Sequence, residues 1–373
     1  MANGAGPLPN QQLLPDVTNA PPALGGYPLL GTMAAWSDEG GKLAIANDRS
    51  KPPYVPQPLN PNWTTAEAPA IAVSFELENV YVAWTDLSGT VRVASTRDGF
   101  GYAMGVSVPG TSGGPSILVA DRRVYVAWRD GSNSLLRLAI FDGDFMNLAE
   151  VQTGTTLSSR PTLAWSSGKL YALCGGNPDG TGERAVQVFV SENGGTTFSP
   201  VNVQSAASFG PPSMAVTDGR FELVWADDTD KSIRYATGDR LDQLAVTRYS
   251  DTCPLGGPVI VGQPNGSVVG WAGGIPDKAR KGHPIIVGRL PPVNEAAAMV
   301  EAEARITATR ARRIAEPTCG AFEIYDPAEG KCVSKGGCFG GCVLESIDII
   351  FGYPIFNPAA YALCVVVCKS EDK

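Results

Sequence analysis

The sequence of 373 residues contains a single histidine, His283, and few positive charges. One histidine excludes metal sites built from several histidines and argues against histidine-based catalysis. The 29 lysines and arginines are outnumbered by 37 acidic residues, which leaves a formal net charge of −8. Nucleic-acid binding requires a basic surface, so we expect no nucleic-acid partner. We also expect no cofactor and no metal ion.

Long apolar runs and a secretory signal are missing too. No stretch of about 18 uncharged apolar residues is present, so we expect no transmembrane segment. Residues 1–7 lack the basic start and apolar stretch of a signal peptide. Six of the eight cysteines nevertheless crowd into residues 319–368, which is typical of disulfide modules in oxidising surroundings. We expect an extracellular or particle-surface protein whose export route the sequence does not reveal.

The chain is rich in short strand patterns. Its 43 glycines and 30 prolines are typical of many short strands joined by tight turns. Residues 115–142 contain three apolar or alternating runs of strand length, separated by Asp-Arg-Arg and Gly-Ser-Asn-Ser. The pattern recurs along about three quarters of the chain. A proline opens each repeat, at Pro28, Pro69, Pro115, Pro161, Pro212 and Pro258.

A tryptophan marks the second strand of most repeats. The fourth repeat departs, with Leu173 at the aligned place, whereas the other five carry Trp36, Trp84, Trp128, Trp225 and Trp271. A period of 41 to 51 residues signals a repeat array, and stacked four-stranded units bury their faces when the ring closes. We predict an all-β fold, a six-bladed β-propeller at 27–291. Residues 1–26 are interpreted as an extended arm, which can add one strand to the last repeat.

A turn in the fourth repeat carries a resemblance to a known family. Residues 191–198 read Ser-Glu-Asn-Gly-Gly-Thr-Thr-Phe and resemble the Asp box of the sialidase (BNR-repeat) superfamily, with Asn193 in place of the aspartate. A looser echo lies at residues 95–102. The motif is a turn device in which the side chain caps backbone N–H groups and glycine adopts a left-handed conformation. The resemblance implies a sialidase-like propeller fold and does not by itself imply activity.

The composition changes after Leu290. Residues 292–317 are rich in alanine, glutamate and arginine, which predicts a connecting helix. Residues 318–373 form a Cys-rich tail module, in which we expect disulfides among Cys319, Cys332, Cys338, Cys342, Cys364 and Cys368. Residues 323–330 suggest a hairpin with a turn at Asp-Pro-Ala-Glu-Gly.

Two CxxxC pairs in the tail place their sulfurs on one helical face. The pairs resemble a cystine-stapled helical-hairpin scaffold, and this resemblance implies the bridges Cys338–Cys368 and Cys342–Cys364. A β alternative stays open for residues 365–367. The apolar segment 343–367 must dock on the propeller, bury in a partner or touch a membrane, because so small a module cannot hide it. We expect a protein partner or self-association through the helix and the tail.

Candidate binding residues lie where one mouth of the channel is expected. The periodic tryptophans fit core packing between blades, whereas Trp63 and Trp165 break the period and are candidates for a surface role. An aspartate follows two residues after four of the tryptophans. The charged residues near this mouth have two interpretations: they cap their own turns, or they form a ring that binds a ligand. The set comprises Asp38, Asp86, Asp130, Asp227, Asp228, Arg129 and Arg160.

The sialidase resemblance does not extend to a catalytic set. The family clamps a substrate carboxylate with three arginines, but only Arg160 lies at the start of a first strand, and Arg92, Arg137 and Arg234 fall within third strands. We therefore assign no catalytic residue. Cys174 and Cys253 are expected to be buried free thiols, with a bridge between them as the alternative.

These observations favour a non-enzymatic recognition or assembly protein, whose propeller presents a face to glycans or a protein ligand while the tail attaches to a larger structure. A sialidase-like glycoside hydrolase that uses funnel-face carboxylates is the alternative. A propeller that carries a membrane-active Cys-rich peptide is the third reading.

Overall fold

The computed structural model describes most of residues 11–290 and four short strands beyond them. Within 11–290 it omits 19, 28–30, 48–56, 61, 66, 75–76, 78, 97–102, 109–112, 176–184, 204–205, 218, 251–253, 255, 264–265 and 274–281. Beyond 290 it describes 323–326, 331–334, 347–350 and 353–356. The chain divides into two compact units, Met1–Pro292 and Val293–Lys373. No helix among the described residues is long and apolar enough to cross a membrane.

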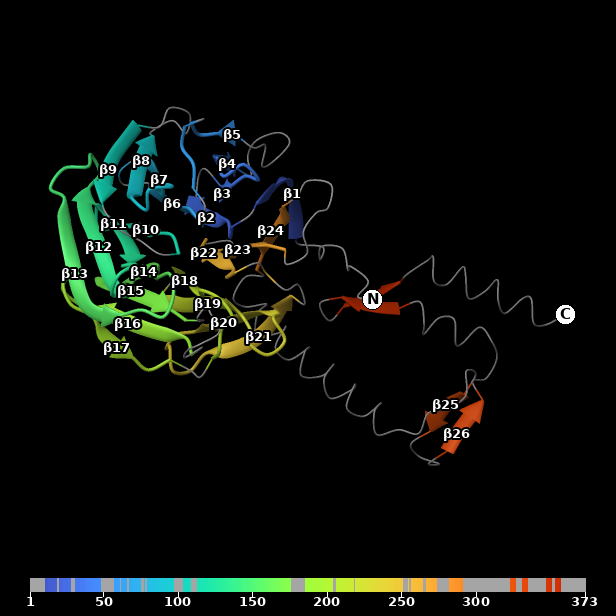
Figure 1. Cartoon of the computed structure of the whole chain (residues 1–373). Coiled ribbons are helices and arrows are strands. Elements are labelled where there is room, and N and C mark those ends of the chain that lie inside the picture. The colour runs from blue at the N-terminus through green and yellow to red at the C-terminus, as the bar shows by residue number, and fades with distance from the viewer. Residues whose placement is uncertain are drawn as a thin grey trace. The chain divides into compact units, whose positions relative to one another are not determined.

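The first unit is a six-bladed β-propeller, as predicted (Figure 1). Each blade is one four-stranded antiparallel sheet. The first three blades comprise β2 (Ala23–Tyr27), β3 (Gly31–Ser37), β4 (Leu43–Asn47) and β5 (Gln57–Pro58); β6 (Ala70–Ser74), β7 (Asn79–Thr85), β8 (Val91–Thr96) and β9 (Ala103–Val108); and β10 (Ser116–Ala120), β11 (Arg123–Arg129), β12 (Leu135–Asp142) and β13 (Ala149–Thr156).

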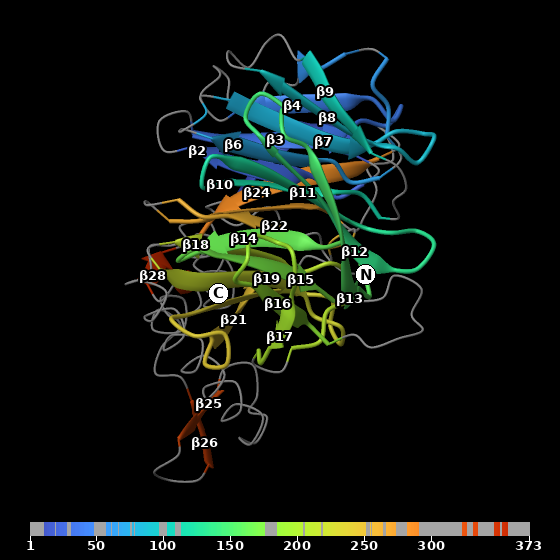
Figure 2. The ribbon, with the colours of Figure 1, turned by 90° about the vertical axis from the view of Figure 1, so that its left-hand side faces the viewer.

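The last three blades continue around the ring (Figure 2). They comprise β14 (Thr162–Ser166), β15 (Lys169–Cys174), β16 (Gln187–Ser191) and β17 (Ser199–Val201); β18 (Ser213–Thr217), β19 (Arg220–Ala226), β20 (Ile233–Gly238) and β21 (Ala245–Ser250); and β22 (Val259–Val261), β23 (Val268–Ala272), β24 (His283–Arg289) and β1 (Gln11–Thr18). The first strand of each blade contacts the first strands of both neighbours, which closes the ring around a central axis.

The closing blade joins two distant parts of the sequence. β1 pairs with β24, so residues 11–18 form the outer strand of the last blade. The prediction that the N-terminal segment adds a strand to the last repeat is confirmed. Residues 23–26, which we also place in the extended arm from the sequence, form the first strand of blade 1 together with Tyr27. Pro28 therefore does not open that strand, because Pro22 precedes it and the first interval becomes 47 residues.

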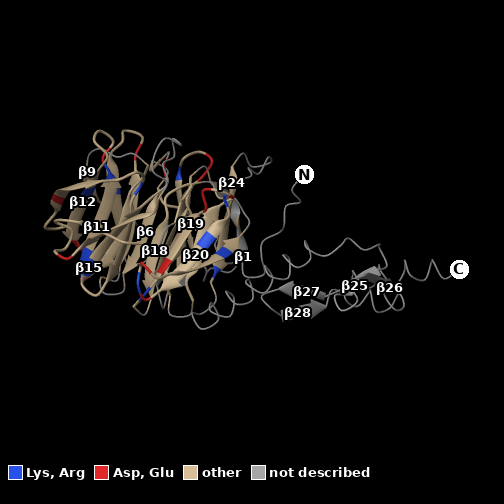
Figure 3. Cartoon of the chain, turned by 90° about the horizontal axis from the view of Figure 1, so that it is seen from below, with Lys and Arg blue, Asp and Glu red and all other residues tan. Residues whose placement is uncertain are grey.

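The second strands hold the core together. Every residue of β7 is buried, and Val124–Trp128 of β11 are buried as well. These strands lie inside each sheet and pack against adjacent blades on both faces, which favours continuous β-branched and aromatic runs. Along the ribbon, several acidic residues lie in the loops that join strands, whereas several basic residues lie within strands (Figure 3).

The second unit is described only as two hairpins. β25 (Glu323–Asp326) pairs with β26 (Lys331–Ser334), which confirms the hairpin predicted around residues 323–330. β27 (Ile347–Ile350) pairs with β28 (Tyr353–Phe356) inside the apolar segment. The predicted helix at 292–317 and five of the six tail cysteines lie outside the described residues. The sixth, Cys332, lies in β26, but its side chain is not described.

Candidate functional site

One mouth of the central channel is hollowed into a vestibule of about 280 Å³. Its walls are the segments that lead into the six first strands, and most of the residues are small or rigid. They are Ala20, Pro21, Glu67, Ala68, Gly113, Arg160, Thr162, Pro211, Pro212, Ser213, Gly256, Gly257, Pro258 and Val259. Backbones pack tightly there: a Cβ atom on Gly114 would lie 2.4 Å from the Ala68 carbonyl oxygen. Glycine is required for such an approach.

Glu67 and Arg160 are the only charged residues in the described vestibule wall. The Gly113 N–H donates a 2.8 Å hydrogen bond to Oε1 of Glu67. The other oxygen, Oε2, is buried and has no hydrogen-bond partner. Because a buried carboxylate oxygen is costly to leave unpaired, Glu67 is the polar group of this wall that most needs a partner.

Arg160 crosses the mouth from blade 4 to blade 2. Its Nη2 atom donates a 2.9 Å hydrogen bond to the Pro69 carbonyl. Burial lowers the pKa of Arg160 to about 10, and the nearby Glu67 charge opposes this shift. Arg160 also lines the channel below, so its side chain lies between the two cavities. The sequence identified Arg160 as a residue of the mouth, and the structure places it there.

The aspartates that follow the tryptophans lie in the turns between second and third strands, on the same side of the ring as the vestibule, because second strands run back toward it. None of them lines the vestibule. Each caps its own turn instead. Asp38 Oδ1 accepts hydrogen bonds of 2.8 Å from the N–H groups of both Gly40 and Lys42. Asp227 Oδ1 likewise accepts a 2.9 Å hydrogen bond from the Thr229 N–H.

Three of these turns carry an additional arginine, and in the Asp227 turn Nε of Arg234 lies 3.5 Å from Oδ2 of Asp227. Asp86 accepts hydrogen bonds from the Ser88 N–H and from Nε of Arg92, at 2.9 and 2.8 Å. Asp130 accepts the equivalent bonds from Ser132 and Arg137, at 2.8 and 2.9 Å. Arg92 and Arg137 therefore hold turns of their own blades, as their position in third strands suggested, and are not free to clamp a ligand.

The hydrogen bonds keep the carboxylates of Asp86 and Asp130 ionised. Burial acts to raise the pKa of Asp86, but bonds from Ser88, Arg92 and Thr90 outweigh it and lower the pKa to about 2. For Asp130 the bonds from the Ser132 hydroxyl and N–H dominate, burial opposes them and Arg137 adds to them, so its pKa also falls to about 2. Neither group can donate a proton at ordinary pH.

The other predicted binding residues are also tied into the blades. Arg129 donates through Nε to the Leu157 carbonyl at 3.0 Å, which ties the end of β11 to the segment that follows β13. Asp228 pairs with Lys231 at 3.1 Å. A ligand-binding ring made of these turns stays a prediction, whereas their hydrogen bonds favour turn capping.

The tryptophans divide as expected in all but one case. Trp36, Trp84, Trp128, Trp225 and Trp271 are buried between blades. The surface position predicted for Trp63 is wrong: it is buried and stacks on Trp84, with ring centroids 4.7 Å apart. Trp165 is half-buried, stacks on Tyr125 and lines the channel. A break in periodicity alone could not separate these two situations.

Cys174 takes the place of the missing tryptophan. Trp128 follows Ala127, which pairs with Ser116, and Cys174 follows Leu173, which pairs in the same way with Thr162. The alignment of Leu173 with the tryptophans was therefore one residue off. The Cys174 thiol is free and buried, as predicted, and lies 3.4 Å from Oε1 of Gln187. Cys253 lies outside the described residues.

The Asp-box-like turn adopts the expected local geometry. Oδ1 of Asn193 accepts a 3.0 Å hydrogen bond from the Thr197 N–H, and the Ser191 hydroxyl accepts one of 2.8 Å from the Gly195 N–H. Gly194 and Gly195 have φ values of 67° and 96°. A repeated Asp box is not shown, because residues 97–102 of the second echo lie outside the described part of the chain.

Within the described residues no group of three or more histidine, cysteine or acidic side chains could hold a metal ion. Glu67 was missed by sequence reasoning. Glu67 belongs to no motif and occupies no position that recurs in the repeats. The only feature of the sequence that could have indicated it is its place two residues before Pro69. Its partners come from blades 3 and 4, which no local pattern could have revealed.

Comparisons with known proteins find fold relatives only. The sequence matches no known protein family and no curated protein. Among solved structures it is similar to an α-L-arabinanase of Penicillium chrysogenum complexed with arabinobiose, with a TM-score of 0.54 and 11% identity over 74% of this chain and 93% of that one. It is also similar to an α-L-arabinofuranosidase of Fusarium graminearum, with a TM-score of 0.50 and 14% identity over 74% and 94%.

A sialidase shares the architecture as well. The structure of a Trypanosoma rangeli sialidase mutant with trans-sialidase activity matches with a TM-score of 0.53 and 11% identity, over 78% of this chain and 56% of that one. The sialidase-like propeller fold is therefore confirmed. The cystine-stapled scaffold suggested for the tail is not shown.

These comparisons correct our functional expectation. We expected a non-enzymatic recognition or assembly protein, and leaned against an enzyme. The similar propellers named above are glycoside hydrolases, which contradicts that expectation. The expectation failed because it relied on the absence of a sialidase-type catalytic set, whereas the same propeller also supports other glycosidases.

Proposed function

We propose that this chain is a glycoside hydrolase that binds its sugar substrate at the vestibule and uses Glu67 to transfer the proton. The observation that carries the proposal is the Glu67 carboxyl group, which is fixed through Oε1 while Oε2 lies buried beside the cavity without a partner. Glycosidic bond cleavage requires a positioned carboxyl group that gives a proton to the leaving oxygen.

The second carboxylate of such a site must stay ionised, either to attack the sugar or to activate water. Asp86 and Asp130 meet this electrostatic requirement, because hydrogen bonds hold the pKa of each near 2. Both turns lie on the vestibule side of the ring but outside the vestibule lining, so a bound sugar must extend from the vestibule over the rim to reach them. They supply the candidates for the ionised role, and Glu67 supplies the candidate for the proton-transferring role.

Arginine content narrows the substrate class. Arg160 is the only arginine in the described vestibule wall, and Arg92 and Arg137 are paired with aspartates of their own blades. A carboxylate clamp made of several arginines therefore has no visible source. This favours neutral sugars over sialosides, and the similar arabinanase and arabinofuranosidase make α-L-arabinofuranosides the first substrates to test.

The test is hydrolysis of a panel of aryl glycosides, with α-L-arabinofuranoside, β-xyloside and α-sialoside as the first members, and of arabinan. We expect turnover of a neutral glycoside by the full chain. Glu67→Gln should lower kcat by about a hundredfold or more with little change in KM, which is the usual effect of removing a general acid or base. Glu150→Gln is the matched control, because Glu150 is exposed on β13.

Asp86→Asn and Asp130→Asn then identify the ionised partner, since loss of activity is expected in one and not in both. Absence of turnover across the panel, or a fully active Glu67→Gln variant, would contradict the proposal.

A further inference from the structure

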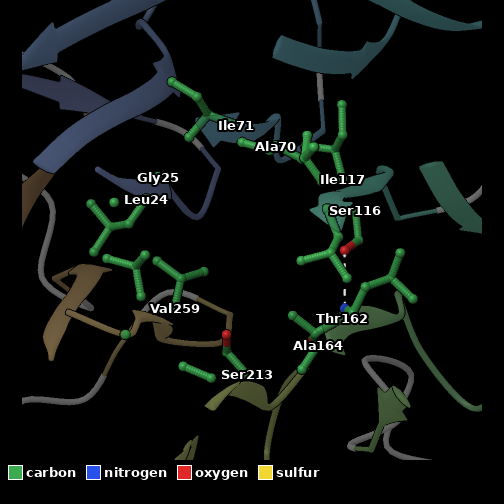
Figure 4. Close-up of a pocket in the computed structure, with 18 of the residues that line it drawn as sticks. Leu24, Gly25, Ala70, Ile71, Ser116, Ile117, Thr162, Ala164, Ser213 and Val259 are labelled. Atoms are coloured by element: carbon green, nitrogen blue, oxygen red, sulfur yellow. Dashed lines mark hydrogen bonds between the residues drawn. The ribbon is translucent and has the colours of Figure 1, made fainter. Parts of the chain in front are cut away.

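A second cavity of about 540 Å³ lies along the propeller axis below the vestibule. Its walls are the first strands of all six blades, as the close-up shows (Figure 4). Arg160, Thr162, Ser213 and Val259 line both cavities, so this channel begins where the vestibule ends. Its volume falls within the range of about 300–1,000 Å³ that small-ligand sites occupy.

The channel walls are edges of β-strands. Each first strand pairs only with the second strand of its own blade, so its other edge faces the axis. Near the vestibule, side-chain hydroxyl groups accept hydrogen bonds from some of the backbone N–H groups on these edges. Ser116 Oγ accepts a 3.2 Å hydrogen bond from the Leu163 N–H, and Ser213 Oγ accepts one of 3.2 Å from the Ile260 N–H. Deeper in the channel the described residues offer no such side-chain partners to the strand edges.

The side chains of the wall are small and apolar. Alanine, glycine and valine dominate in the deeper half, for example Ala72, Ala164, Ala215 and Val119. Such walls accept a narrow extended chain with small side chains, and they exclude a bulky or strongly hydrated one. The unpaired strand edges add backbone donors and acceptors along the same axis.

Two opposite charges mark the two ends of the channel. In the described lining, Arg160 at the vestibule end and Asp121 at the far end are the only charged residues. Arg160 makes one hydrogen bond, to the Pro69 carbonyl, and no ion pair with a described residue. Asp121 sits in the turn between β10 and β11, where it and Arg122 have left-handed φ values of 49° and 57°. A two-residue turn between the paired residues Ala120 and Arg123 requires this conformation, and it leaves the Asp121 side chain exposed.

We propose that the channel binds a short peptide in extended conformation, with its terminal ammonium at Asp121 and its terminal carboxylate at Arg160. Exposed strand edges bind extended peptides through main-chain hydrogen bonds, and the charges fix the direction of the chain. β10, which runs the length of the channel, has five residues, and at about 3.3 Å per residue it spans roughly 16 Å. An extended peptide of four or five residues has the same length.

Charge complementarity favours a peptide over a neutral oligosaccharide, because a neutral sugar carries no charge to pair with the guanidinium at one end or the carboxylate at the other. This site shares Arg160 with the vestibule of the proposed hydrolase, and its other charged residue does not take part in the hydrolytic chemistry. Asp121 lines the channel but not the vestibule, so it allows the two proposals to be tested apart.

Isothermal titration calorimetry with the full chain and tetra-alanine tests the inference. We expect binding by the peptide with free ends, and at least tenfold weaker binding, or about 1.4 kcal/mol, for the N-acetylated and C-amidated forms. The Asp121→Asn variant should bind the peptide with free ends only as weakly as the wild type binds the acetylated peptide. It should bind the acetylated peptide with the same affinity as the wild type. The Arg160→Met variant should bind the peptide with free ends only as weakly as the wild type binds the amidated peptide, and should bind the amidated peptide with the same affinity as the wild type.

Matched controls lie on the surface. Asp239→Asn removes an exposed aspartate that pairs only with Arg220 at 3.6 Å, and Arg240→Met removes an exposed arginine that pairs with Asp242 at 2.7 Å. Both controls should bind tetra-alanine as the wild type does. Ala120→Leu, which narrows the channel near Asp121, should abolish peptide binding while near-ultraviolet circular dichroism stays native.

The inference is overturned if tetra-alanine fails to bind at millimolar concentration, or if capped and free peptides bind equally. It is also overturned if a neutral tetrasaccharide binds instead and Ala120→Leu blocks that binding. Glycosidase activity of Asp121→Asn should equal that of the wild type, so a failure of the peptide site leaves the proposed hydrolase function standing, and the reverse holds too.

Discussion

The hydroxyl group of Tyr235 donates a 2.7 Å hydrogen bond to the buried carboxylate of Glu222. Thr217 donates to the same carboxylate at 2.9 Å, and Ser267 of the neighbouring blade donates a further short hydrogen bond. Burial raises the pKa of Tyr235, and Glu222 raises it further, so this hydroxyl keeps its proton. A carboxylate thus joins blades 5 and 6 where the equivalent second-strand positions of blades 2, 3 and 4 carry Tyr81, Tyr125 and Tyr171.

Glu222→Leu should lower the free energy of unfolding by about 2–4 kcal/mol, because it leaves three hydroxyl donors without an acceptor in the core. Glu222→Gln keeps one acceptor and should cost less. Urea unfolding followed by tryptophan fluorescence measures both. Equal stability of the leucine variant and the wild type would show that the network contributes nothing.

Acid should weaken the turns at Asp86 and Asp130. Both groups have a folded-state pKa of about 2, below the usual value of 3.8. A lowered pKa contributes stability that is complete above the unfolded value and is lost as the pH falls through the folded value. Stability should therefore decline between about pH 4 and pH 2. Asp86→Asn and Asp130→Asn should each flatten that decline, as thermal melts across the window would reveal, and an unchanged slope would count against the assignment.

The Cys174 thiol should react slowly in the native protein. Burial raises its pKa, so little thiolate is present at neutral pH and reagents have poor access. Iodoacetamide labelling with peptide mapping by mass spectrometry should show Cys174 protected in buffer and modified in urea. Rapid native labelling at this peptide would indicate that the fourth blade opens more readily than its packing implies.

The two stacked aromatic pairs, Trp63 with Trp84 and Tyr125 with Trp165, should differ in their contribution to stability. Trp84→Ala removes a fully buried ring from between blades and should cost about 3–5 kcal/mol. Trp165→Ala removes a half-buried ring beside the channel and should cost clearly less. Denaturant midpoints of the two variants decide the point, and a larger loss for Trp165→Ala would mean that the channel wall supports the ring of blades.

Much of the propeller was predictable because prolines and large aromatic residues recur at the same positions of the repeat. The six prolines indicated the number of blades and where most first strands begin, and the second strands of five blades were marked by Trp36, Trp84, Trp128, Trp225 and Trp271. The first and fourth blades were misread where a marker changed. Blade 1 begins after Pro22, and in blade 4 the tryptophan position holds Cys174, which a search for aromatic residues passes over.

The candidate site was predictable only in part. Arg160 could be placed at the mouth because the repeat fixed its position relative to Pro161. Glu67 gained its meaning from the Gly113 N–H and from Arg160, which come from two other blades. Contacts between segments so far apart depend on how the ring closes. The same limit applies to Trp63, whose burial follows from its stacking on Trp84 rather than from its place in the repeat.

The pairing of β1 with β24 has a consequence for how the chain acquires its structure. The outer strand of blade 6 is synthesised first, and its partner is synthesised some 270 residues later. Five blades can form in sequence as they emerge, but the sixth must wait for both ends of the propeller. Ring closure is thus the most non-local step of folding, and contacts of that kind form slowly. A cut anywhere between β1 and β2 would convert this closing step from an intramolecular event into a concentration-dependent one.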